Sequence, residues 1–95
     1  MRRVRIVEEV LRRVASHPNR HVRQDFARAY EMLTRAKDAR SWDELRAVPV
    51  KDEAGIVPAD TWMIPFAYGG IVIYVITEEG AEIFSVYIPD SHRDS

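Results

Sequence analysis

The sequence predicts a single α+β domain in which an N-terminal helical hairpin packs on a three-stranded antiparallel meander sheet. Apolar residues recur at helical spacing through the first part of the chain, whereas branched and aromatic segments separated by glycine-containing turns fill the last third. A chain of 95 residues is too short to bury two separate hydrophobic cores. We therefore expect one domain over residues 1–95.

Two amphipathic helices are expected in the N-terminal half. The first, over about residues 3–15, is predicted from apolar side chains on one helical face: Ile6, Val7, Val10, Leu11 and Val14. Pro18 disfavours helical geometry just before it, and Asn19 is a good cap for a helix that begins after it. A second apolar stripe then predicts a helix over about residues 20–38, so that the two form a hairpin.

A short helix over about residues 42–46 comes next, because Ser41 and Glu44 have the spacing of a capping box. In that motif the serine oxygen accepts from the Glu44 amide and the carboxylate reaches back to the Ser41 amide. Residues 48–60 contain two prolines and a glycine among charges, which is typical of a long irregular connection.

Three strands are predicted over about residues 61–68, 71–77 and 81–88, joined by turns at Gly69-Gly70 and Glu78-Glu79-Gly80. Pro65 has no N–H for a sheet ladder, so the first of these strands should be an edge and the second central.

Both faces of this meander are apolar, and a helical hairpin covers one face only. An uncovered apolar face is unusual for a monomer, so we expect a protein partner there, either another protein or a second copy of the chain. We assign the partner to the face that carries Trp62, Phe66, Val72, Tyr74 and Ile76. The alternative is that the connection over residues 48–60 folds across the second face.

Positive charge gathers in the N-terminal half of the chain. Residues 1–46 hold 12 Arg and Lys against 7 Asp and Glu, while residues 47–95 hold 2 against 8. Arginine suits phosphate recognition, so a nucleic-acid surface on the second helix would use Arg20, Arg23 and Arg28. The alternative is a solvated helix face whose arginines form i,i+4 ion pairs.

Composition excludes several classes of site. The chain has no cysteine, which excludes disulfides, zinc–thiolate sites and cysteine nucleophiles and favours a reducing compartment such as the cytoplasm. No apolar segment has the length of a signal peptide or membrane span, so no membrane association is expected. His17 and His21 have the spacing of helical metal ligands, but Pro18 lies between them and no third ligand accompanies them. We expect no metal and no cofactor.

The order of two helices, an irregular link and a meander resembles the RelE/ParE toxin superfamily of bacterial toxin–antitoxin systems. The segment GGIVIYVITEEGAEIFSVYIPDSHRD carries the likeness: a glycine turn, a branched strand with Tyr74 near its middle, an acidic glycine turn, and a last strand followed by His92-Arg93. The likeness covers roughly residues 20–94. The family also has a strand before its first helix, where the periodicity here predicts helix.

The resemblance implies a small α+β protein that cuts ribosome-bound messenger RNA or inhibits DNA gyrase, and that an antitoxin neutralises by wrapping on its surface. It implies Tyr87, His92 and Arg93 as the catalytic candidates, in which cationic groups stabilise the phosphate and a tyrosine or histidine moves protons. Alternatively, the chain is a non-enzymatic protein–protein interaction module, built as a homodimer through the apolar sheet face or by strand addition at an edge.

Overall fold

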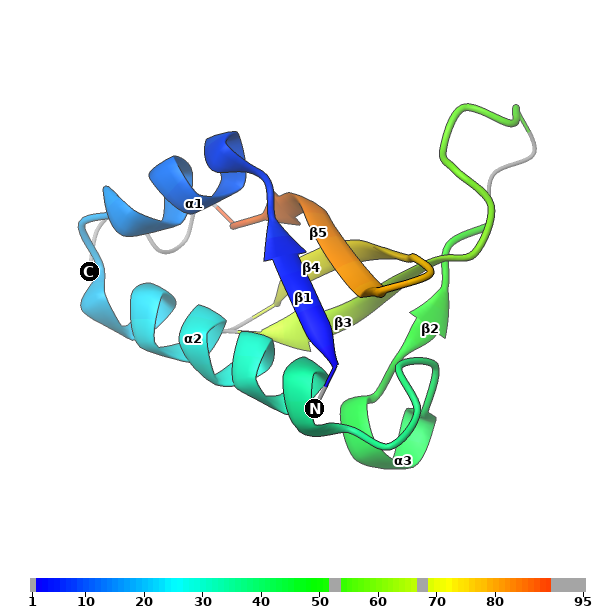
Figure 1. Cartoon of the computed structure of the whole chain (residues 1–95). Coiled ribbons are helices and arrows are strands. Elements are labelled where there is room, and N and C mark those ends of the chain that lie inside the picture. The colour runs from blue at the N-terminus through cyan, green and yellow to red at the C-terminus, as the bar shows by residue number, and fades with distance from the viewer. Residues whose placement is uncertain (1, 52–53, 67–68, 90–95) are drawn as a thin grey trace.

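A computed structural model of the chain describes residues 2–51, 54–66 and 69–89. Five strands form one mixed sheet in the order β1-β5-β4-β3-β2, in which β1 runs parallel to β5 and the other neighbours are antiparallel (Figure 1). The elements follow the chain as β1 (Arg3–Ile6), α1 (Glu8–Ala15), α2 (Arg20–Arg35), α3 (Trp42–Leu45), β2 (Val48–Pro49), β3 (Thr61–Phe66), β4 (Gly70–Ile76) and β5 (Gly80–Tyr87). The α+β class is confirmed, but the three-stranded sheet is wrong, because two more strands extend the meander at its edges.

The first predicted helix is shorter than expected, because residues 3–6 form β1. Val4 and Ile6 alternate with arginines, which is the period of a strand, and Val4 is buried. The helical spacing that begins at Ile6 hides this signal in the sequence. Residues 3–6 form a strand because of a contact with a distant part of the chain. They pair with β5 over the register from Arg3↔Gly80 to Ile6↔Ile83.

Gly80 makes that parallel contact possible. Its φ is +154°, and a Cβ placed on it would clash with the backbone carbonyl oxygen of Arg3. Any other residue at this position would therefore push β1 away from β5.

Two consecutive helices form, but the predicted helical hairpin is not matched in detail, because α1 begins only at Glu8 and α2 ends at Arg35. The Asn19 side chain accepts a hydrogen bond of 2.9 Å from the His21 N–H, as a cap should. Helix α2 ends at Arg35, three residues earlier than predicted. There the Arg2 guanidinium donates to the carbonyl oxygens of Leu33 (2.6 Å) and Ala36 (2.9 Å), so that a cation occupies the negative end of the helix.

Half of the predicted capping box is present in α3. The Ser41 oxygen accepts from the Glu44 N–H at 3.1 Å. The Glu44 carboxylate does not reach back to Ser41 but accepts from the backbone N–H groups of Lys37 (2.9 Å) and Asp38 (3.2 Å). It thereby stabilises the link between α2 and α3.

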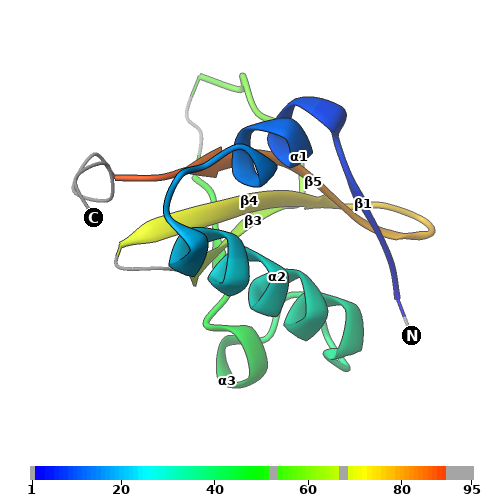
Figure 2. The same ribbon diagram turned by 90° about the vertical axis from the view of Figure 1, so that its left-hand side faces the viewer.

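The core lies between α1 and α2 and one face of the sheet (Figure 2). Its largest fully buried side chains are Val22, Leu33, Val72, Tyr74 and Ile83. Phe26 of α2 packs edge to face on Phe66 of β3, with ring centroids 6.0 Å apart. The Tyr74 hydroxyl donates to the carbonyl oxygen of Ala39 and so ties the sheet to the link after α2.

The partner face predicted from the sequence is therefore wrong. Val72 and Tyr74 are 0% exposed and Phe66 is 7% exposed, while Trp62 and Ile76 pack against the same core. Alternation along a strand shows which residues share a face but not which face the helices cover. Here the helices cover the face that was expected to bind a partner.

Candidate functional site

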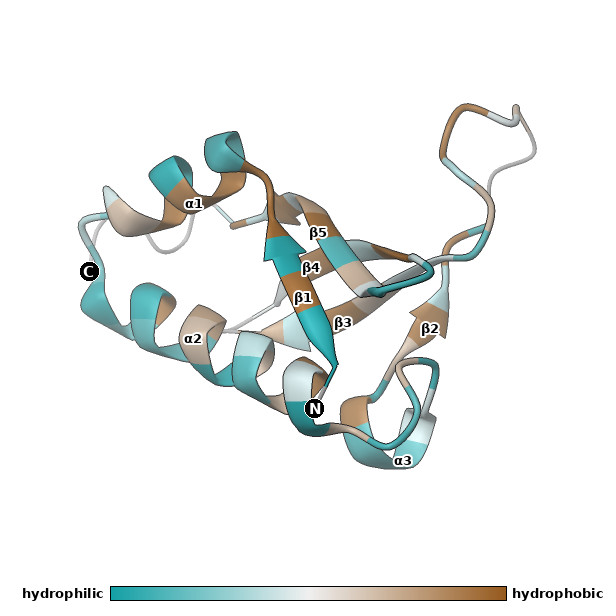
Figure 3. Cartoon of the chain, viewed as in Figure 1, coloured by the Kyte–Doolittle hydropathy of each residue, from teal (hydrophilic) through white to brown (hydrophobic). Residues whose placement is uncertain are grey.

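The opposite face of the sheet, termed the open face, carries apolar side chains that no described helix covers (Figures 1 and 2). The register places on it Met63 and Pro65 of β3, Ile71, Ile73 and Val75 of β4, and Phe84 and Tyr87 of β5. Tyr87 and Pro65 are exposed, whereas the others are partly buried by their neighbours. Figure 3 shows the apolar colouring along these strands, and the described part of the 48–60 connection leaves the sheet instead of crossing it.

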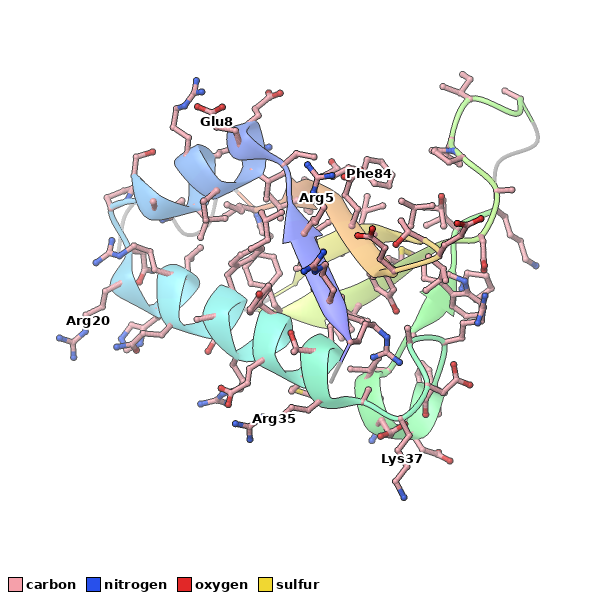
Figure 4. The ribbon with its side chains drawn as sticks, in the orientation of Figure 1. Arg5, Glu8, Arg20, Arg35, Lys37 and Phe84 are labelled. Atoms are coloured by element: carbon pink, nitrogen blue, oxygen red, sulfur yellow. The ribbon has the colours of Figure 1, made fainter. Side chains whose placement is uncertain are left out.

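A β-bulge adds Phe84 to this face. Tyr74 pairs with Ile83 and Ile73 pairs with Ser85, so Phe84 is an extra residue in β5. Beyond it, on the outer side of β5, Arg5 of β1 pairs with Glu82 (Figure 4 labels Arg5 and Phe84). The open face therefore has an apolar centre and a charged border at β1.

One edge of the sheet offers few hydrogen-bond donors to a further strand. The Val50 N–H donates to the Thr61 carbonyl oxygen at 2.9 Å, which fixes the alternation of the ladder there. Along an antiparallel strand the backbone N–H and C=O groups of successive residues point alternately towards and away from the neighbouring strand. By this alternation the backbone groups of Pro49 in β2 and Pro65 in β3 face the outer edge of the sheet, where proline has no N–H to donate. The prediction that this strand is an edge is wrong, because β3 lies between β4 and β2; Pro65 itself lies beyond the two residues, Trp62 and Met63, that pair with β2.

The other edge, β1, is partly covered by α2. The Arg2 N–H donates to the Thr34 carbonyl oxygen at 3.1 Å, and the Tyr30 hydroxyl lies 3.5 Å from the carbonyl oxygen of Val4. Strand addition is therefore hindered at both edges, and the open face is the larger surface left for a partner.

A groove lies where the open face meets α3. It has a volume of about 310 Å³ and is lined by Trp42, Arg46, Val48, Met63, Ile64, Pro65 and Ile71. Trp42 is 54% exposed, and the Arg46 guanidinium stacks over its ring at 5.1 Å. This groove was not predicted, because it combines a short helix, a two-residue strand and the meander.

The catalytic candidates fall only partly within the described structure. Tyr87 lies at the end of β5, opposite Ile71, and its side chain is 55% exposed on the open face. His92 and Arg93 lie outside the described residues. The structure therefore gives a position for Tyr87 and no geometry for the three together.

The three arginines predicted to bind nucleic acid all lie on α2 but differ in their surroundings. Arg20 and Arg28 are exposed, whereas Arg23 is partly buried and donates to the carbonyl oxygen of His17. The expected i,i+4 pairing occurs at Arg35, which lies 2.8 Å from the Glu31 carboxylate. Arg20 and Arg28 are thus the members of the set best placed to meet a phosphate.

A charged cluster joins the start of β3 to the link before α3. Arg40 forms two hydrogen bonds to the Asp60 carboxylate, at 3.1 and 2.5 Å, and the Trp62 indole N–H donates to the same carboxylate at 2.8 Å. These hydrogen bonds lower the pKa of Asp60, and the one from Arg40 has a larger effect than the one from Trp62. All three side chains are engaged with each other, so the cluster has a structural explanation.

The histidines do not form a metal site in the described chain. The His17 ring accepts at Nδ1 a 3.1 Å hydrogen bond from the Asn19 N–H, within the turn between α1 and α2. Among the described residues there is no group of three His, Asp or Glu side chains arranged for a metal ion. The described helices also include none that is long and apolar enough to cross a membrane.

Comparison of the chain with protein-family models, with curated proteins and with solved structures gives no match. The function is therefore inferred from the sequence resemblance, the order of the elements and the open face.

Proposed function

We propose that the chain is a RelE/ParE-like protein that binds a macromolecular target, either ribosome-bound messenger RNA or gyrase, and is neutralised by a protein partner. The observation that supports this is the order of the elements: a strand, two helices, an irregular link and a meander. Strand β1 stands where the resemblance expects a strand before the first helix. Both candidate targets are cytoplasmic, so the proposal assigns the protein to the cytoplasm.

Within this proposal, Tyr87 is the residue that contacts the target. Its ring is exposed at the end of β5, directly before the tail that carries His92 and Arg93 in the sequence. If the target is RNA, Arg93 and His92 would supply cationic groups for the phosphate, and Tyr87 or His92 would move protons. Arg20 and Arg28 would extend the phosphate contacts along α2.

Induced expression in a bacterial host tests the proposal. We expect growth arrest with the wild-type chain, relieved by co-expression of a neutralising partner. If the chain cleaves RNA, the His92→Ala/Arg93→Ala and Tyr87→Phe variants should grow, and the Arg12→Ala variant, changed at an exposed ion pair, should still arrest. No growth arrest with the folded wild-type chain would contradict the proposal, whereas arrest by every variant would remove the three residues from the mechanism.

A second candidate function is a non-enzymatic interaction module that forms a homodimer through the open face. The observation that favours it is an apolar face without a described cover in a sheet whose edges both hinder strand addition. Ile73 lies near the middle of this face and is partly buried there.

Light scattering of the purified chain tests the second candidate. We expect a dimer for the wild type and a monomer for Ile73→Glu, which puts a charge in the centre of the face. Glu82→Gln, at the border of the same face, serves as the matched control and should remain a dimer. A wild-type chain that is monomeric over a wide concentration range would contradict this function.

A further inference from the structure

The loop between β2 and β3 presents an apolar surface to solvent. Residues 54–59 read Ala-Gly-Ile-Val-Pro-Ala, six consecutive residues without a polar side chain. All but Val57 are exposed, and Ile56, at 83%, is the most exposed of the large apolar residues in the described chain. A run of exposed apolar residues of this length needs a functional explanation.

This loop projects away from the body of the protein. Figure 1 shows it leaving the sheet at the end of β2, and Figure 3 shows its apolar colouring. At the base of the loop the Val50 N–H donates to the Thr61 carbonyl oxygen and Asp60 is bound by Arg40, and the Thr61 hydroxyl donates to the carbonyl oxygen of Pro58. We refer to residues 54–59 as the arm.

The groove at α3 has the chemistry to receive the arm. Its walls are the apolar parts of Trp42, Val48, Met63, Pro65 and Ile71, and its volume of about 310 Å³ is large enough for an isoleucine side chain. The groove borders the start of β2, at Val48, whereas the arm begins after the end of β2. The arm of the same chain extends away from α3, which contributes Trp42 to the groove (Figure 1).

A second copy of the chain brings the two features together. In a pair related by a twofold axis beside β2, the two β2 strands run in opposite directions. The end of one strand then lies beside the start of the other, so each arm faces the groove of its partner. Pro49 points outward at the centre of this contact and lacks an N–H, so the copies meet through side chains instead of a continuous sheet.

We propose that the chain forms a twofold dimer by arm exchange, in which Ile56 of each copy inserts into the groove lined by Trp42, Val48 and Met63 of the other. This dimer is an alternative to the open-face dimer of the second candidate function, because it uses a contact away from the centre of that face. It does not depend on the toxin-like function.

Light scattering over a dilution series gives the first test. We expect a wild-type dimer and an Ile56→Asp variant whose dimer dissociates about 100-fold more readily or worse, because each dimer buries two Ile56 side chains. The circular dichroism of the variant should equal that of the wild type, since Ile56 contributes nothing to the core. Leu11→Asp, at an apolar residue of α1 that is 50% exposed, is the matched control and should stay dimeric.

Cross-linking gives the second test, and the absence of cysteine from the chain makes it specific. An Ile56→Cys chain is mixed with a Met63→Cys chain that carries a tag of different mass, and the mixture is oxidised. We expect a disulfide-linked heterodimer in this mixture and little in a matched mixture of Leu11→Cys with Met63→Cys.

Several outcomes would overturn the inference. These are a wild-type chain that is monomeric, an Ile56→Asp variant as dimeric as the wild type, and equal cross-linking in the two mixtures. If Ile56→Asp stays dimeric while Ile73→Glu becomes monomeric, arm exchange fails and the open-face dimer stands. If a monomeric wild type binds phospholipid vesicles and Ile56→Asp does not, the arm is a membrane contact instead.

Discussion

The hydroxyl of Tyr74 lies in the centre of the core and has one partner, the carbonyl oxygen of Ala39. Ala39 belongs to the link between α2 and α3, so this buried hydrogen bond, together with the Arg40–Asp60 ion pair, holds that link to the sheet. Burial raises the pKa of Tyr74, because the charged phenolate is disfavoured away from water.

Tyr74→Phe should destabilise the fold by about 1–3 kcal/mol, because the Ala39 carbonyl oxygen would lose its buried donor. Urea unfolding at neutral pH measures this, with Tyr87→Phe at an exposed position as control. If Tyr74→Phe lowered the free energy of unfolding by less than Tyr87→Phe does, the hydrogen bond to Ala39 would not have the stabilising role given to it here.

The same residue predicts a dependence on alkaline pH. The pKa of Tyr74 is raised in the folded state, while an unfolded tyrosine ionises near about pH 10. The contribution of Tyr74 to the free energy of unfolding is thus fully present below about pH 10, and it is lost as the pH rises towards the pKa of Tyr74 in the folded state. We expect the unfolding free energy of the wild type to fall more steeply than that of Tyr74→Phe above this pH.

Arg2 caps the C-terminal end of α2. Arg2→Ala should destabilise the fold by about 1–3 kcal/mol, since three charge-assisted hydrogen bonds to helix and link carbonyl oxygens are lost. Arg12→Ala, at an exposed i,i+4 pair with Glu8, should change stability by less than about 0.5 kcal/mol. Chemical denaturation of both variants checks the difference, and equal effects would argue against the cap.

At the scale of elements, each edge of the sheet is shaped by residues that hinder further pairing. Pro49 and Pro65 remove outward donors from β2 and β3, and α2 lies along β1. Such edges are common in proteins that must avoid uncontrolled sheet growth.

Replacing these prolines should restore the donors. We expect a Pro49→Val/Pro65→Val variant to aggregate faster than the wild type, because two outward N–H groups and a branched side chain at each site favour strand addition. Pro58→Val, in the arm, is the matched control. Turbidity and light scattering during incubation measure the effect, and equal rates for the two variants would contradict it.

At the scale of the whole molecule, the sheet has one closed face and one open face. Ile83 is 0% exposed beneath the helices, whereas Ile73 on the opposite face is only partly buried. The two residues are chemically identical and lie on neighbouring strands, so they report on the two faces separately.

Ile83→Ala should destabilise the fold by about 2–5 kcal/mol, because it leaves a cavity in the core. Ile73→Ala should lower the free energy of unfolding of the monomer by about 1 kcal/mol or less, because less of the Ile73 side chain is buried. Unfolding at low protein concentration, where self-association is negligible, measures both. Similar losses for the two variants would mean that the open face is covered.

Local patterns in the sequence were enough to predict the class of the fold, the helical pair, the three meander strands and the excess of apolar side chains on the sheet. These features depend on periodicity and turn residues, which are local properties of the chain. Asn19 and Ser41 were identified as caps for the same reason, since a cap acts within a few residues of its own position.

Long-range contacts were needed to establish which face of the sheet is open, that residues 3–6 are a strand, and where the groove and the arm lie. Alternation along β4 is equally consistent with helices on either face, so the assignment of Val72 and Tyr74 to a partner was wrong. Strand β1 forms because it pairs with β5, nearly eighty residues away in the chain, and the groove joins three elements that are separate in sequence. Contacts between distant segments decide these features, and local patterns do not encode them.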